Sequence, residues 1–171
     1  MSEIRWLDDE EQRTWRAFLG AAQLLLDQLD RELQRDAQMP HAYYEILVAL
    51  SETPGRALRM SELAVRTLSS RSRLSHAVAK LEEYGWVRRR DCPTDKRGQL
   101  AQLTDAGFAA LAAAAPGHVE GVRSHLFDQL SDEQVGQLRR ISEAVLRNLA
   151  EHHPAAALHQ AKAASEPAAA S

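Results

Sequence analysis

The most telling stretch of this chain lies at residues 69–90, which read SSRSRLSHAVAKLEEYGWVRRR. Within it, apolar residues recur at three- and four-residue steps, the spacing of one buried helix face. A serine pair offers an N-cap before this run, and Gly85 after it suits a left-handed C-cap. The pattern predicts a helix over residues 71–84, followed at once by a basic strand. The residues of the buried face are Leu74, Ala77, Val78 and Leu81.

The opposite face of this helix is polar and cationic, and no acidic residue precedes Glu82. Small side chains let a helix approach DNA closely, hydroxyls meet phosphates, and Arg or His can reach guanine acceptors. We expect Arg73 and His76 to face bases. The alternative is that this is only the solvated face that every amphipathic helix needs. The face consists of Ser72, Arg73, Ser75, His76, Ala79 and Lys80.

The basic charge of the chain is concentrated around this helix. Residues 54–103 hold 11 Lys/Arg and 5 Asp/Glu, a net charge of +6, whereas the remaining residues hold 10 and 19, a net charge of −9. One compact basic block is the pattern expected of a surface that meets a polyanion.

A second group of cations lies in the hairpin that follows the helix. Arginines at 88–90 lead into a turn with Lys96 and Arg97, an unfavourable concentration of like charge for a structural ribbon. Asp95 stands close enough to brace Arg97, and a braced arginine at a hairpin tip suits a narrow minor groove. Helix and hairpin together favour a DNA-binding surface over a merely solvated one.

The preceding residues read as helices around one short strand. The spacing predicts a helix over 8–38, and a second that begins after Pro40 and ends at 53–55. A very short strand is expected at 57–59, and then a short helix at 62–67. Its expected N-cap is Ser61, and its expected inward-facing residues are Leu63, Ala64 and Leu68.

After the predicted helix at 71–84, strands are expected at 86–90 and 99–103 around a turn at 92–98. Thr104 should cap the next helix, which Pro116-Gly117 should kink or interrupt. A capping box at 131–134 opens a last helix. The apolar residues that this last helix should place inside are Val135, Leu138, Ile141, Val145, Leu146 and Leu149.

The predicted fold is therefore mainly α with a small β-wing (α+β). A winged helix-turn-helix core is flanked by N- and C-terminal dimerisation helices. The expected parts are an N-terminal dimerisation helix at 1–38, a winged helix-turn-helix DNA-binding domain at 39–103, C-terminal dimerisation helices at 104–151 and a disordered tail at 152–171.

Five short motifs are together typical of one family. They are Leu63-Ala64, Ser70 to His76 with Leu81-Glu82, Gly85-Trp86-Val87, Asp95-Lys96-Arg97 and Leu103-Thr104-Asp105-Ala106-Gly107. On these motifs the chain resembles the MarR family of bacterial winged helix-turn-helix transcriptional regulators, over about residues 8–150. The Asp-x-Arg wing tip and the Leu-Thr-x-x-Gly junction are the most specific parts of the match.

The resemblance implies a homodimer that reads a pseudo-palindromic operator in double-stranded DNA and acts as a repressor. Recognition helix 70–84 would enter the major groove and wing 86–103 the minor groove. Arg97 would be the minor-groove residue, with Asp95 as its brace, and His76 stands where many relatives have arginine. The expected DNA-binding residues are Ser70, Arg71, Ser72, Arg73, Ser75, His76, Lys80, Arg88, Arg90, Asp95, Lys96 and Arg97.

The terminal helices carry more apolar surface than a small winged core can bury, which favours a symmetric dimer over packing within one subunit. The interface candidates are Ile4, Trp6, Leu7, Leu126, Leu130, Leu138, Ile141, Val145 and Leu149. Family members often bind a small aromatic or anionic effector between the dimer helices and the winged domain. Residues of these types are more often ordinary core or rim, and the candidates to line such a site are Trp15, His41, Tyr43 and Tyr44.

Other chemistry finds little support. Cys92 is the only cysteine, which excludes an intrachain disulfide but leaves a redox-responsive regulator as an alternative. His118 and His125 share a helix face without carboxylate or cysteine partners at ligand spacing, so no metal site is predicted. No catalytic residues, cofactor or enzyme activity are predicted, because no triad or phosphate-cradling glycine loop occurs.

The chain is expected to be cytoplasmic. Residues 1–9 lack the basic start and apolar centre of a signal peptide, and no run approaches the roughly 20 apolar residues of a membrane span.

The remaining alternative to a DNA-binding regulator is a winged-helix module that recruits an acidic protein partner instead.

Overall fold

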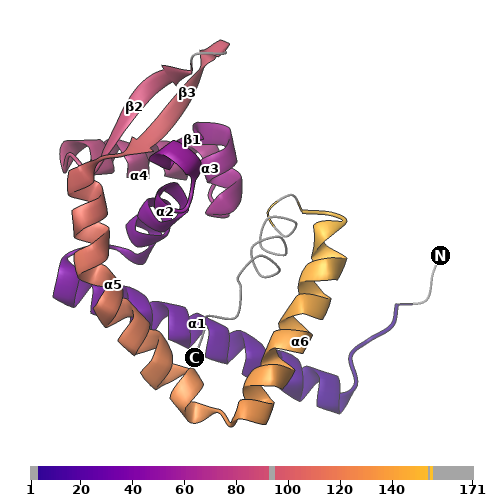
Figure 1. The fold of residues 1–171 in the computed structure, drawn as a ribbon. Coiled ribbons are helices and arrows are strands. Elements are labelled where there is room, and N and C mark those ends of the chain that lie inside the picture. The colour runs from indigo at the N-terminus through magenta and orange to yellow at the C-terminus, as the bar shows by residue number, and fades with distance from the viewer. Residues whose placement is uncertain (1–3, 93–94, 154, 156–171) are drawn as a thin grey trace.

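Long helices at both ends of the chain flank a small lobe of short helices and strands (Figure 1). This computed structural model describes residues 4–92, 95–153 and 155, and of residues 95–97 the backbone only. The helices are α1 (Asp9–Ala37), α2 (His41–Ser51), α3 (Met60–Arg66), α4 (Arg71–Glu83), α5 (Asp105–His125) and α6 (Asp132–Ala150). The strands are β1 (Ala57–Arg59), β2 (Val87–Cys92) and β3 (Asp95–Leu103), and single 3-10 turns lie at Pro54–Arg56 and Phe127–Gln129. The predicted mainly helical fold with a small sheet is confirmed.

The three strands form an antiparallel sheet in the order β1-β3-β2. Leu58 pairs with Ala101, and Arg88 with Gln102. The predicted turn at 92–98 is wrong, because β3 already begins at Asp95 and Cys92 pairs with it. A register shift between Asp91 and Cys92 lets the ladder continue through residues whose composition is typical of a turn.

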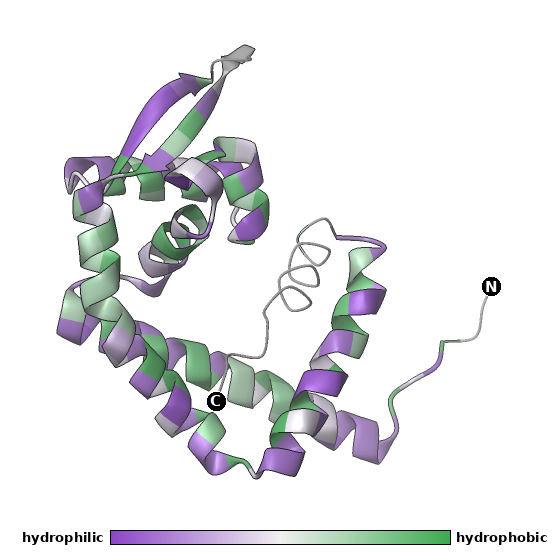
Figure 2. Ribbon diagram, in the orientation of Figure 1, coloured by the Kyte–Doolittle hydropathy of each residue, from purple (hydrophilic) through white to green (hydrophobic). Residues whose placement is uncertain are grey.

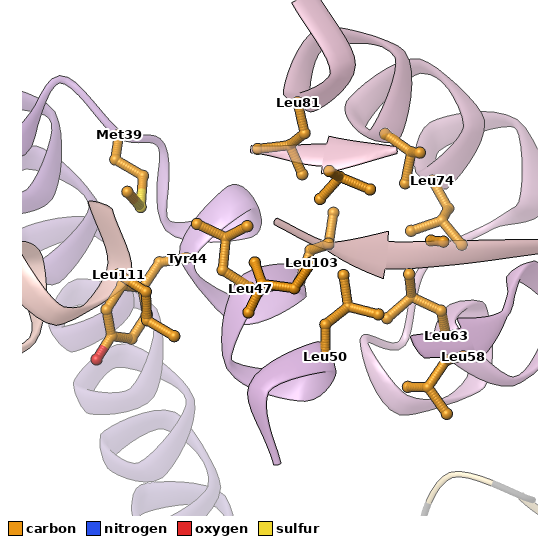
Figure 3. Close-up of a cluster of buried hydrophobic side chains, with 14 of the residues drawn as sticks. Met39, Tyr44, Leu47, Leu50, Leu58, Leu63, Leu74, Leu81, Leu103 and Leu111 are labelled. Atoms are coloured by element: carbon orange, nitrogen blue, oxygen red, sulfur yellow. The ribbon is translucent and has the colours of Figure 1, made fainter. Parts of the chain in front are cut away.

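The hydrophobic core lies inside the small lobe, where α2, α3, α4, the sheet and the start of α5 meet (Figure 3). Leu47, Leu63 and Leu81 are completely buried there. Each such side chain contributes roughly 1.5–3 kcal/mol to folding through its removal from water. The core therefore fixes α4 against the sheet from behind and leaves its other face outside.

The junction between the wing and α5 is fixed by Thr104 and Gly107. The Thr104 hydroxyl accepts a hydrogen bond from the Gly107 N–H (3.0 Å) and donates to the carbonyl oxygen of Gly85 (2.7 Å). The Thr104 N–H donates to the Trp86 carbonyl oxygen at 3.0 Å. A Cβ atom on Gly107 would clash with that same carbonyl. The Leu-Thr-x-x-Gly motif is therefore a close backbone crossing.

The long helices α1 and α5 pack side by side (Figure 1). Gly121 permits their close approach, since a Cβ there would come within 2.6 Å of Glu32 Oε2. His125 Nε2 lies 2.7 Å from Glu32 Oε1 at the same contact. This pairing holds the pKa of the Glu32 carboxyl below its ordinary value, with a smaller contribution from a Gln28 hydrogen bond.

Two expectations for the short helix are wrong. Ser61 is not the cap: α3 begins at Met60 directly from β1, with Arg59 at the capping position and no side-chain cap. Leu68 is 65% exposed, because it adopts a left-handed φ of 50° just after the helix. The Ser69 N–H closes this helix end on the Ala64 carbonyl at 2.9 Å, so the chain reverses and turns Leu68 outward.

Two expectations for the C-terminal half also need correction. Of the two outcomes predicted for Pro116-Gly117, a kink or an interruption, the interruption does not occur: α5 runs through Pro116, and its buried residues Leu111 and Gly121 lie on either side, so packing offsets the proline's cost of about 3 kcal/mol. The last helix, α6, has its predicted capping box at Ser131, but none of its residues is buried within one chain. The predicted tail falls almost entirely outside the described residues.

Candidate nucleic-acid interface

Helix α4 presents its polar face to solvent. Leu74, Val78 and Leu81 are buried on the inner side, while Ala77 is partly buried. The sequence-predicted binding residues of this helix all lie on the exposed side. They are Arg71, Ser72, Arg73, Ser75, His76 and Lys80, with Ser70 at the start of the helix.

The start of α4 suits an anion. Ser70 is the N-cap, and its hydroxyl accepts a hydrogen bond from the Arg73 N–H at 3.3 Å. A helix N-terminus attracts negative charge through its unpaired N–H groups and its dipole. Within the described part of the chain, Arg71 and Arg73 form no ion pair. Two unneutralised guanidinium groups therefore stand beside the helix end.

Lys80, at the other end of this face, pairs with an acid. Its Nζ lies 2.7 Å from Glu83 Oε2, and this hydrogen bond raises the pKa of the ammonium group. Both side chains are more than half exposed, so the pair is weak and can exchange Glu83 for a phosphate.

The arginines of β2 alternate between the two faces of the sheet. Arg88 Nε and Arg90 Nη1 donate to the same oxygen, Gln102 Oε1, at 3.0 and 2.9 Å. Both side chains are exposed, whereas Arg89 is turned to the other face and contacts α4. The predicted contacts Arg88 and Arg90 thus lie together, oriented by a glutamine that the sequence analysis did not single out.

The tip of the wing carries the Asp-x-Arg motif. The side chains of Asp95, Lys96 and Arg97 lie outside the described residues, so the predicted brace between Asp95 and Arg97 stays a prediction. The backbone of β3 is described from Asp95 onward. It carries these residues to the end of the hairpin that projects farthest from the core (Figure 1).

The four predicted ligand residues do not form one cluster. The rings of His41 and Tyr44 stack at 6.4 Å, and Tyr44 is 8% exposed. Tyr43, beside them on α2, is partly buried against the core. Trp15 instead contacts Phe18 on α1. The His41 N–H donates to Asp30 of α1, which lies about 22 Å along the helix axis from Trp15, so Trp15 is far from the other three residues.

The structure adds His118 to this group, which the sequence analysis treated only as a possible metal ligand. Its ring lies 4.4 Å from that of Tyr44 and 5.5 Å from that of His41, and its buried Nδ1 has no hydrogen-bond partner among the described residues. Burial lowers the pKa of the His118 imidazole, His41 acts in the same direction, and Glu32 opposes them. Only tertiary packing brings these rings together.

Two further features concern the described residues only. No group of three or more His, Cys, Asp or Glu side chains there is arranged to bind a metal ion. None of the helices in those ranges is both long and apolar enough to span a membrane. Cys92 is 6% exposed at the end of β2.

Known proteins share this architecture. The sequence pattern of the MarR family matches residues 37–98, from the end of α1 into the wing. The chain is similar to Sco3205, a MarR family transcriptional regulator from Streptomyces coelicolor whose crystal structure was solved in complex with DNA. The two sequences are 57% identical, and the structures superpose with a TM-score of 0.82 over 87% of this chain and 93% of Sco3205. The chain belongs to the MarR family of transcriptional regulators.

The chain is also similar to two further transcriptional regulators. AbsC, a MarR family transcriptional regulator from Streptomyces coelicolor, is 40% identical, with a TM-score of 0.81 over 87% of this chain and 100% of that one. The transcriptional repressor MprA of Escherichia coli (strain K12) is 29% identical over 103 residues, which cover 60% of this chain and 58% of MprA. The family resemblance inferred from the wing and junction motifs is confirmed.

Proposed function

We propose that this MarR-family regulator is a cytoplasmic homodimer that binds a pseudo-palindromic operator in double-stranded DNA and represses transcription there. Helix α4 enters the major groove, and the wing enters the adjacent minor groove. The observation that carries the proposal is the exposed face of α4, which is free of acids from Ser70 to Lys80 and includes Arg71 and Arg73, neither of them ion-paired to a described residue. The DNA-bound form of Sco3205 and the repressor MprA support it.

The dimer is supported by apolar surface that one chain leaves uncovered. Trp6, Phe18 and Ile141 are 82%, 58% and 61% exposed. Hydrophobic residues recur along α1 and α6 outside the core of the small lobe (Figure 2). Many large exposed apolar side chains on the terminal helices favour an interface, and a two-fold dimer would present two α4 helices about one DNA turn, roughly 34 Å, apart.

The experiment begins with selection of bound duplexes from a random pool by the purified protein. Affinity for the selected duplex is then measured as salt is raised. If each subunit neutralises about four phosphates, the log–log slope will be roughly −7. Salt-independent binding would contradict the proposal.

Three substitutions assign the contacts in the same assay. Arg97→Ala should weaken binding to all sequences and reduce the slope by about two, one contact from each subunit, whereas Arg73→Ala and His76→Ala should relax base preference. Arg31→Ala is the matched control, because Arg31 is 71% exposed on α1 and pairs with Asp27, away from α4. If base preference is unaltered in both Arg73→Ala and His76→Ala, the proposed placement of α4 in the major groove is wrong.

A further inference from the structure

Arg89 is the one arginine of β2 that turns toward α4. Successive side chains of a strand point to opposite faces of a sheet, and Arg88 and Arg90 share Gln102 on the other face. The Arg89 side chain is 25% exposed, and its Nε is buried. Its surroundings differ from those of an arginine that is free to meet phosphate.

Three interactions join Arg89 to α4. Glu82 Oε1 accepts a hydrogen bond from the Arg89 N–H at 2.8 Å, and Glu82 Oε2 lies 3.1 Å from the guanidinium Nη1. The third interaction reaches back two helical turns, where Nη2 donates to the Ser75 carbonyl oxygen at 2.8 Å. Both Glu82 oxygens and both terminal nitrogens of Arg89 are therefore engaged.

We propose that Arg89 and Glu82 are positioning residues for DNA binding: they fix the angle between α4 and the wing so that both elements meet one duplex together. The planar guanidinium has donors in a fixed fork, which suits it to hold a carboxylate and a carbonyl at set positions. The bonded carbonyl belongs to Ser75, next to the readout residue His76, so the link acts where α4 faces the bases. The inference deepens the proposed function and rests on it.

Substitution of Glu82 distinguishes a positioning role from an effect of net charge, because the two predict opposite changes in DNA affinity. Glu82 is an acid inside the basic block, so its removal should strengthen binding to a polyanion if only net charge mattered. Glu82→Gln removes the same charge as Glu83→Gln one residue further on, and among the described residues Glu83 pairs with the exposed Lys80 alone. Positioning predicts that Glu82→Gln weakens affinity for the selected duplex about tenfold, the size of one misaligned base contact, while Glu83→Gln leaves it unchanged or tighter.

Arg89 variants supply the second readout. Arg89→Met should weaken specific binding by a similar factor without changing the salt slope, because no phosphate contact is lost, and non-specific affinity for a scrambled duplex should be retained. The double variant Glu82→Gln/Arg89→Met should bind no more weakly than Arg89→Met alone, because the two residues act as one unit. A thermal melt followed by circular dichroism checks that each variant is folded. If Arg89→Met is not folded, Arg89→Lys takes its place.

The outcomes are distinct. Equal affinities for Glu82→Gln and Glu83→Gln, or a slope reduced by about two in Arg89→Met (one lost phosphate contact per subunit), would overturn the positioning role while leaving the proposed function intact. Failure of the wild-type protein to bind any selected duplex would overturn the proposed function and this inference with it.

Discussion

At the scale of single residues, Gly107 shows how one backbone position ties the wing to the long helix α5. Its N–H meets the capping hydroxyl of Thr104, and its Cα lies against the backbone of Trp86. The family motif that the sequence presents as a pattern is thus a steric requirement, since any side chain here pushes α5 away from the end of β3.

Gly107→Ala should destabilise the protein by about 3 kcal/mol, because the new methyl group clashes with the Trp86 carbonyl and approaches Leu103 Cδ1 to 2.8 Å. The free energy of unfolding from urea titration measures it. Gly117→Ala in the same helix is the control, since its Cβ would meet nothing within 4 Å. It should stabilise the protein by about 0.5–1 kcal/mol through helix propensity. Equal effects would show that the junction tolerates a side chain.

At the scale of elements, His118 lies where α1, α2 and α5 meet. His118 of α5 faces His41 and Tyr44 of α2 and Glu32 of α1, and its pKa is lowered from 6.5, chiefly by burial. The folded protein therefore prefers the neutral imidazole more strongly than the unfolded chain does. Below pH 6.5 the unfolded chain binds more protons, so stability falls with falling pH until the lowered pKa is passed.

The free energy of unfolding should consequently decrease as the pH is lowered from about 7.5 to about 5.5, and part of that decrease should disappear in His118→Gln. Chemical denaturation at each pH measures it. His76→Gln is the matched control, because His76 is exposed on α4, and its pH profile should follow that of the wild type. A His118→Gln profile parallel to the wild-type profile would contradict the assignment.

At the scale of the whole molecule, α6 is the element that one chain does not account for. It begins with a capping box and has an apolar stripe, yet Ile141, Val145 and Leu149 are 61%, 51% and 44% exposed. An amphipathic helix of this kind gains its stability from burial of that stripe. A second copy of the chain provides the missing surface in the proposed dimer.

Ile141→Asp should therefore convert the protein from a dimer of about 38 kDa to a monomer of 19.0 kDa and reduce affinity for the two-half-site duplex. Sedimentation equilibrium measures the mass. Ala144→Asp, which adds the same charge about 120° from the centre of the stripe, should remain dimeric. A dimeric Ile141→Asp would exclude α6 from the interface.

Most helix boundaries followed from the chain itself. The capping serines at 70 and 131, Thr104, the left-handed Gly85 and the apolar steps of α4 are local signals, and each stands where the sequence predicted it. The exposed face of α4 followed as well, because helix periodicity assigns side chains to faces without reference to the rest of the fold.

What the sequence could not supply were contacts between residues far apart in the chain. Leu68 looked like core because its spacing was helical, but a left-handed turn that closes α3 directs it outward. The turn-like residues 95–98 became strand because β2 offered a ladder, and Pro116 stayed within α5 because burial on both sides outweighed its cost. The link from Arg89 to Glu82 and the grouping of His41, Tyr44 and His118 exist only once strands and helices have packed. Local patterns set which face of each element is polar; tertiary packing, through burial and long-range pairing, decided which polar groups are left free to bind.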